Sequence, residues 1–278
     1  MKLFFLTLLI FHAAHTANSQ QKQIEWLEDF NQASRIASER SRPLLLDFTA
    51  VWCRACREMD ADFWTRGDVI EAAKDFVAVK IDLDKNEKLA NRYGVSFLPN
   101  IVLTDAWGNA LVFHRGFGRR SDREIIEKLA SIPTDFGEIK EAGDSAASGK
   151  NDRAALSKLA DFYQRKKFYY LSSDFYKRLL KQEKSPNERE KTMLLIGFNY
   201  LKIGWADDAR AVFARFKKDF PASERADEAL YGEFSAVAQK NFLVDAGKIL
   251  AELKSKFPKS TFIAPAEQNL QAYQLQAK

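Results

Sequence analysis

The sequence predicts two domains of different fold class: a mixed α/β domain over residues 20–133 and an all-α domain of helical hairpins over residues 151–278. The chain has 278 residues, about twice the commonest domain length of roughly 100–150. Short apolar runs alternate with helical periods in the first part, whereas only helical periods follow later. A leader over residues 1–19 and a linker over residues 134–150, richer in Gly, Ser, Ala and Pro, complete the expected organisation.

Residues 1–19 have the layout of a secretory signal peptide. Lys2 precedes an apolar run from Leu3 to Phe11, and small and polar residues follow. This run is much shorter than the roughly 20 residues of a spanning helix, although an uncleaved membrane anchor is the alternative. We therefore expect an exported protein with no membrane span in the mature chain.

The composition favours packed cores and excludes several classes of protein. The chain is 46% hydrophobic and 29% charged, which excludes a disordered chain. The formal net charge is only +5, and an exported protein without an aromatic-basic groove pattern is not expected to bind nucleic acid. Two cysteines and three histidines, two of them (His12 and His15) in the leader, argue against a metal site. We expect no cofactor, since no flavin or nicotinamide motif is present.

The first domain is expected to form a mixed central sheet flanked by helices. Pro43 introduces the first strand, and Gly94 ends the third helix. A turn at residues 107–109 joins the last two strands, and Ser121 with Glu124 has the spacing of a capping box. The expected elements are, in order, helix 24–36, strand 43–49, helix 60–74, strand 76–83, helix Glu87–Tyr93, strands 100–105 and 110–113, and helix 121–131.

The second domain repeats with a period of 37 residues. A weaker early copy contains Tyr163, Tyr176 and Pro186. A fixed period of this length, with a proline after the second helix, is typical of a helical-hairpin solenoid. The 37-residue shift superposes Asp208-Ala209 on Asp245-Ala246, Phe213 on Leu250, Phe216 on Leu253 and Phe220-Pro221 on Phe257-Pro258.

Cys53 and Cys56 are predicted to be a redox-active pair. A bridge between them closes a very short loop, so it removes little entropy from the unfolded chain and makes a poor structural staple. The pair lies where a strand ends and a helix starts, and there the free N–H groups and the helix dipole stabilise a thiolate at Cys53. Arg54 adds positive charge, and Cys56 is expected one turn further in and less exposed. A zinc site would need a second ligand pair, which the sequence lacks.

Residues 22–131 resemble the thioredoxin superfamily. The segment Trp52-Cys53-Arg54-Ala55-Cys56 matches its WCxxC motif, and the run from Tyr93 to Pro99 matches the approach to its cis-proline. Asp47 matches the buried acid of the family, Lys80 the lysine that faces it, and Gly116 a glycine of the last strand region. The motif from Cys53 to Met59 and the Leu98-Pro99 pair most resemble the C-terminal periplasmic domain of the transmembrane disulfide reductase DsbD. This resemblance implies a periplasmic location.

The resemblance also implies roles for individual residues. Cys53 would be the nucleophile and Cys56 the resolving thiol, while Asp47 would accept and return the proton of Cys56. Lys80 would tune the pKa of Asp47, although a plain surface lysine is the alternative. A cis Leu98-Pro99 bond would present the Leu98 backbone to an extended substrate strand. The residues expected to contact substrate are Trp52, Phe97, Leu98 and Pro99, with a packing role for Trp52 left open.

The second domain resembles tetratricopeptide repeats and implies a protein partner for the helical array. The residues that carry this resemblance are Gly197, Tyr200, Ala209, Phe213 and Pro221. The expected function is therefore reduction of protein disulfides, with electrons from a thiol donor protein. A disulfide oxidase or isomerase, or a non-catalytic scaffold acting through its repeats, are the alternatives. The dipeptide Arg54-Ala55 leaves the redox direction open.

Overall fold

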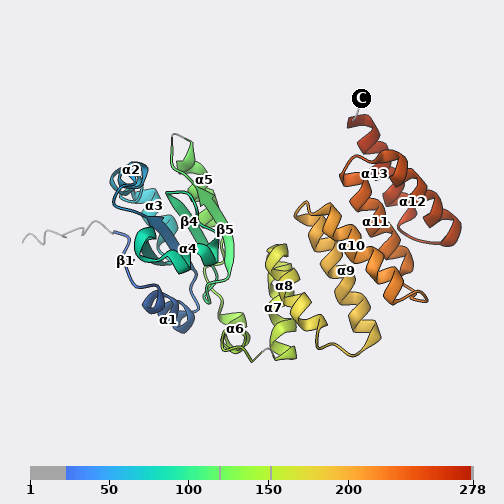
Figure 1. Cartoon of the computed structure of the whole chain (residues 1–278), viewed down its shortest axis with the longest axis horizontal. Coiled ribbons are helices and arrows are strands. Elements are labelled where there is room, and N and C mark those ends of the chain that lie inside the picture. Colours follow the sequence, from blue (N-terminus) through green and yellow to red (C-terminus); the bar gives the residue numbers. More distant parts are fainter. Residues whose placement is uncertain (1–22, 119, 151, 277–278) are drawn as a thin grey trace, which may run out of the picture.

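The structure is a computed structural model that describes residues 23–118, 120–150 and 152–276. The predicted leader, residues 1–19, lies outside the described residues. Figure 1 shows a domain built around a β-sheet, followed by an array of paired helices. Within the described ranges, no helix is long and apolar enough to cross a membrane.

The first domain contains the predicted mixed sheet. Its strand order is β1-β3-β2-β4-β5; β1 and β2 run parallel to β3, and β4 is antiparallel to both β2 and β5. The strands are β1 (Trp26–Leu27), β2 (Leu44–Thr49), β3 (Val77–Asp82), β4 (Asn100–Thr104) and β5 (Ala110–Arg115). The helices are α1 (Phe30–Arg40), α2 (Arg54–Asp62), α3 (Gly67–Ala73), α4 (Glu87–Tyr93) and α5 (Ser121–Ala130), with a 3₁₀ turn η1 (Leu83–Lys85).

The alternation of side chains along β2 divides the core into two layers. Leu44, Leu46 and Phe48 face the layer formed with α1 and α4. Leu45 faces the opposite layer, which is formed with α2, α3 and α5. Since successive strand residues point to opposite faces, Asp47 lies on the same face as Leu45, beneath α2.

Three local expectations for this domain were wrong. Trp26–Leu27 pair with β3 as a strand, so the first helix starts only at Phe30, capped by the Asp29 side chain. The helix expected over 60–74 is two helices, α2 and α3. Ser121 is the first residue of α5 rather than its cap, because its hydroxyl accepts from the Gly118 N–H; the expected capping box is therefore absent.

The segment 134–150, expected as a linker, is an ordered joint between the two domains. It contains the 3₁₀ turn η2 (Gly137–Ile139) and the helix α6 (Lys140–Ala147). The Lys140 ammonium donates to the Ser38 carbonyl at 2.8 Å, which ties α6 to α1. The Trp107 indole packs directly against Gly143, and a Cβ on this glycine would lie 2.2 Å from the ring.

The second domain is a helical array in which each helix packs against the next, while α9 also contacts α11 and α11 contacts α13 (Figure 1). Phe213 lies between Gly197 and Gly232, where added Cβ atoms would approach its ring to 2.6 and 2.3 Å. The helices are α7 (Arg153–Arg165), α8 (Tyr169–Leu180), α9 (Pro186–Lys202), α10 (Ala206–Asp219), α11 (Ala226–Gln239), α12 (Leu243–Lys256) and α13 (Ile263–Gln276).

One hydrophobic cluster spans the boundary between the two domains. Ala106 of the first domain and Phe136 of the joint belong to the same buried cluster as the residues of α7 to α10. The buried Tyr163 hydroxyl donates to the Asp105 carboxylate across the domain boundary. Phe168 packs against this cluster and also against the core of the α/β domain. The helical array is therefore fixed to the sheet domain by buried contacts.

Candidate active site

Cys53 and Cys56 form a disulfide at the amino end of α2. Cys53 is the N-cap residue, and its Sγ accepts from the Cys56 N–H at 3.1 Å. The preceding turn is held by the Cys53 N–H, which donates to the Ala50 carbonyl, and by the Arg57 guanidinium, which donates to the Val51 carbonyl at 2.6 Å. The expected difference in exposure is small, since Cys53 is 5% and Cys56 3% exposed.

Asp47 is a buried carboxylate beneath this end of α2. Its Oδ2 accepts from the Lys80 ammonium at 2.7 Å and from the Trp64 indole N–H at 3.1 Å. Its Oδ1 is buried and has no hydrogen-bond partner in the described part of the chain. Burial raises the pKa of Asp47, and the positive charge of Lys80 opposes this rise without cancelling it. A carboxyl with a raised pKa exchanges its proton at a higher pH than an ordinary aspartate does.

Lys80 links two carboxylates. It lies directly opposite Asp47 in the register of β2 and β3, and its ammonium also pairs with Asp60 of α2. The ammonium lies 4.4 Å from the centre of a Trp26 ring, at the distance of a cation–π contact. Burial works against the charged lysine, but Asp47 and Asp60 outweigh it and raise the pKa of Lys80. Lys80 is therefore a partner of Asp47 and not a free surface lysine.

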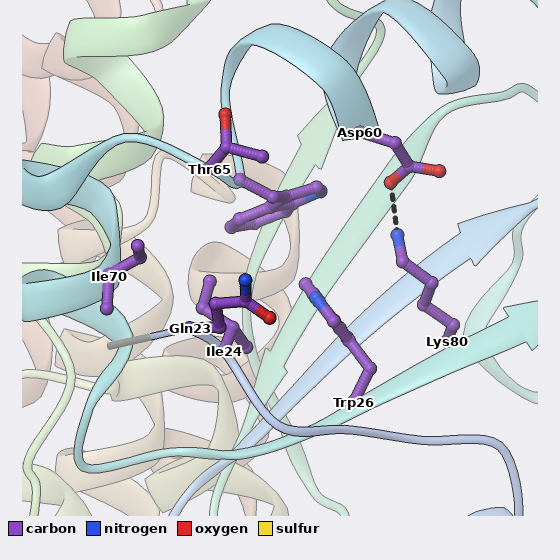
Figure 2. Close-up of a pocket in the computed structure, with 8 residues that line it drawn as sticks. Gln23, Ile24, Trp26, Asp60, Thr65, Ile70 and Lys80 are labelled. Atoms are coloured by element: carbon purple, nitrogen blue, oxygen red, sulfur yellow. Dashed lines mark hydrogen bonds and ion pairs between the residues drawn. The ribbon is translucent and has the colours of Figure 1, made fainter. Parts of the chain in front are cut away.

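Trp26, Asp60 and Trp64 were not predicted from the sequence as part of this site. Asp60 could have been found, because it follows Cys56 by four residues and so lies on the same face of α2. Trp26 and Trp64 carry no local signal, since their roles arise from contacts between distant segments. A cavity of about 430 Å³ borders these side chains, and it is large enough to hold water beside Lys80. Figure 2 shows Asp60 and Lys80 joined on one side of it, with Trp26 on the lower wall.

An apolar rim surrounds the disulfide. The Leu98–Pro99 peptide bond is cis, as expected, and Leu98 packs against the cluster of Ala50, Cys53 and Cys56. Phe97 is 61% exposed and Trp52 64% exposed. The Trp52 indole N–H donates to Asp84 at 2.9 Å, which fixes the ring at the rim. Sequence reasoning missed Val51, which is 82% exposed beside Trp52.

Arg54 contributes less to the site than its position suggested. Its guanidinium pairs with Glu58 at 2.8 Å, and its side chain is 86% exposed. Solvent and the neighbouring carboxylate therefore screen its charge. Across the described residues, no three His, Cys, Asp or Glu side chains gather as a metal site would require.

Residues 25–106 match the Thioredoxin-like family model, and with the observed sheet they define a thioredoxin-like domain that carries a Cys53–Cys56 disulfide. Thioredoxin Y2 from the chloroplast of Arabidopsis thaliana is 36% identical over 103 residues, which cover 37% of this chain and 58% of that protein. Thiol:disulfide interchange protein DsbD of Vibrio vulnificus is 32% identical over 129 residues, which cover 42% of this chain and 22% of DsbD. The chain thus spans less than two thirds of either relative. A solved structure of DsbH oxidoreductase aligns with a TM-score of 0.37 and 18% identity, over 45% of this chain and 96% of that one.

Proposed function

We propose that this protein is an exported, periplasmic thiol–disulfide oxidoreductase that reduces protein disulfides through Cys53 and Cys56. The observation that carries the proposal is the Cys53–Cys56 disulfide at the N-terminus of α2, above the buried Asp47–Lys80 pair. A helix N-terminus stabilises a thiolate, and a buried acid can move the second proton. The similarity of residues 25–106 to thioredoxins and to part of DsbD supports the same chemistry.

The reaction begins with both cysteines reduced. The Cys53 thiolate attacks one sulfur of the substrate disulfide, a mixed disulfide forms, and the substrate S–S bond breaks to release one substrate thiolate. Asp47 then takes the proton of Cys56, whose thiolate attacks Cys53 Sγ. The mixed disulfide breaks, the second substrate thiol leaves, and the Cys53–Cys56 disulfide remains. Two electrons have moved to the substrate, so a dithiol donor protein must reduce the pair again.

The reductive direction is the preferred one. A positive charge at Arg54 would favour an oxidant, since a stabilised thiolate makes a pair more oxidising. Its pairing with Glu58 and its exposure weaken that argument. The partial similarity to DsbD favours a reductase. A disulfide oxidase or isomerase remains the alternative enzyme.

The helical array is proposed to recruit a protein partner. Its 37-residue pattern resembles tetratricopeptide repeats, and the buried joint holds it in a fixed position beside the sheet domain. A non-catalytic scaffold would use the same array, with Cys53 serving only to tether a client. If partner binding and the cellular phenotype both survive replacement of Cys53 by Ser, the proposed enzyme activity is wrong and the array alone accounts for the function.

Trapping of substrates tests the proposal. In Cys56→Ser the attack by Cys53 still occurs, but the mixed disulfide cannot be resolved, so client proteins should accumulate as covalent adducts. The adducts should disappear on treatment with a reductant and should be absent from the matched variant Cys53→Ser. If Cys56→Ser forms no covalent adducts in cells that contain disulfide-bonded proteins, the proposed function is contradicted.

A further inference from the structure

The turns inside the three helical hairpins have the same backbone conformation. Lys167, Gly204 and Asn241, each 37 residues apart, have φ values of +64°, +81° and +62°. The next residue is an aromatic N-cap in every copy: Phe168, Trp205 and Phe242 have ψ values of 65°, 64° and 66°. Each of these aromatic residues is therefore presented at the same place on its hairpin.

The first aromatic residue is covered, whereas the next two are not. Phe168 packs against the core of the α/β domain. Trp205 is 44% and Phe242 51% exposed, and Tyr170 and Val244 near the same turns are 54% and 76% exposed. Large apolar side chains that gather on a surface are typical of an interaction site. The equivalent residue of the first hairpin, Phe168, already packs against the α/β domain.

The exposed residues form one continuous edge. The Tyr170 and Trp205 rings lie 5.5 Å apart, which joins the first two turns. Lys240 joins the second and third, since it pairs with Asp207 at 2.6 Å and lies 5.6 Å from the centre of the Phe242 ring. We call Tyr170, Trp205, Phe242 and Val244 the turn edge. A hollow of about 370 Å³ beside Trp205 is bordered by Asp207, Asp208 and Lys240.

Positive charge flanks this edge. Lys166, Lys167 and Lys202 are exposed at or beside the first two turns, and none of them forms an ion pair with a carboxylate in the described part of the chain. Asp207 pairs with Lys240. Of the two acidic residues that border the hollow, Asp208 is the one that forms no ion pair among the described residues. The net charge around the turn edge therefore complements a negatively charged partner.

We propose that the turn edge binds a segment of a protein partner that carries apolar side chains with carboxylates beside them. The apolar side chains would pack on Trp205 and Phe242, and the carboxylates would pair with Lys166, Lys167 and Lys202. This inference rests on the proposed recruitment by the helical array and names the surface and the kind of partner.

Binding of two labelled peptides to the full chain tests the proposal. One peptide contains leucine, phenylalanine and glutamate, and the other has lysine in place of every glutamate. Fluorescence anisotropy should show that the acidic peptide binds and that the basic peptide does not. The double variant Trp205→Ala/Phe242→Ala should bind the acidic peptide at least about ten-fold more weakly, because two central aromatic contacts are lost. Leu275→Ala, which removes an exposed apolar side chain from α13, is the matched control and should change binding less than about two-fold.

A second variant separates docking from folding. The double variant Lys166→Glu/Lys202→Glu leaves the aromatic residues in place, and its affinity for the acidic peptide should also fall by about ten-fold or more. The proposal is overturned if either double variant binds like the wild type, if the basic peptide binds equally well, or if the turn edge proves to be covered by a second copy of the chain in sedimentation experiments. All variants keep both cysteines, so their reaction with a small disulfide should be unchanged. A failure of that reaction in the wild type would instead count against the proposed oxidoreductase.

Discussion

The Lys80 ammonium lies 2.7 Å from the Asp47 carboxylate, at directly opposed positions of neighbouring parallel strands. Asp47 is 2% exposed, so its charge has lost most of its hydration, and one lysine replaces only part of it. The pKa of Asp47 consequently stays raised by burial even with a cation in contact. We propose that this carboxyl group accepts and returns a proton, so that both catalysis and stability should depend on pH.

Asp47→Asn should increase stability and slow resolution. Because the pKa of Asp47 is raised, ionisation of this buried carboxyl lowers the stability of the folded state. The loss of stability is absent at pH below the ordinary pKa of 3.8, and it grows as pH rises through the folded-state pKa. The free energy of unfolding of the oxidised variant should therefore exceed that of the wild type by about 1–3 kcal/mol at neutral pH, and the two should converge in acid. Release of substrate from the mixed disulfide should slow about 100-fold. Urea titrations and single-turnover kinetics measure both, and a variant less stable than the wild type at neutral pH contradicts this reasoning.

Lys80→Met should have the opposite effect on stability. Without the ammonium only the Trp64 indole N–H offsets the burial of Asp47, so the pKa of this carboxyl should rise further and the pH profile of resolution should shift to higher pH. The free energy of unfolding at neutral pH should fall by up to about 3 kcal/mol. Lys85→Met is the matched control, because Lys85 is 79% exposed and its ion pair with Asp82 is worth little. Identical pH profiles for Lys80→Met and the wild type would show that Lys80 does not tune Asp47.

Gly232→Ala should destabilise the helical array. Its Cβ would lie 2.3 Å from the Phe213 ring, which is fully buried between α9 and α11 and has no room to move away. We expect a loss of about 1–3 kcal/mol in the free energy of unfolding. Gly247→Ala in α12 is the control: nothing lies within 4 Å of its Cβ, so the better helix propensity of alanine should stabilise by up to about 1 kcal/mol. Equal effects of the two substitutions on thermal unfolding would contradict the packing of Phe213.

Tyr163→Phe tests the joint between the domains. The Tyr163 hydroxyl donates one of the hydrogen bonds to the buried Asp105 carboxylate. Burial raises the pKa of Asp105, and the hydrogen bond from Tyr163 partly opposes this rise. Loss of this charge-assisted hydrogen bond should cost about 1.5–3 kcal/mol at neutral pH, whereas Tyr170→Phe on the surface should cost almost nothing. Because one buried cluster spans the two domains, the wild type should unfold in a single transition. Two well-separated transitions in calorimetry would show that the domains are independent.

Much of the fold was predictable because its signals are local. The helix Glu87–Tyr93 was expected with both ends correct, since Gly94 adopts the left-handed conformation that ends it. The mixed sheet and the helical array followed from periodicity. The strand Trp26–Leu27 did not, because its partner β3 lies about 50 residues later and the segment itself has a helical period. The break between α2 and α3 was also missed, since the apolar period continues through it.

The candidate site was only partly predictable for the same reason. Cys53 and Cys56 follow a motif with fixed spacing, and Asp47 and Lys80 were assigned from the resemblance to the thioredoxin superfamily. Trp64 and Trp26 contact this group only because α2, β1 and β3 converge there. The sequence could place Arg54 beside Cys53, but not its pairing with Glu58, which changes the weight of its charge.

The reduction potential of the Cys53–Cys56 pair tests the proposed direction most directly. The protein is equilibrated with glutathione buffers, and its free thiols are counted after alkylation. A reductase should give a value near the roughly −270 mV of thioredoxin, well below the glutathione poise of an oxidising compartment. A value near about −120 mV would contradict the account, because such a pair takes electrons from its substrates and would act as a disulfide oxidase.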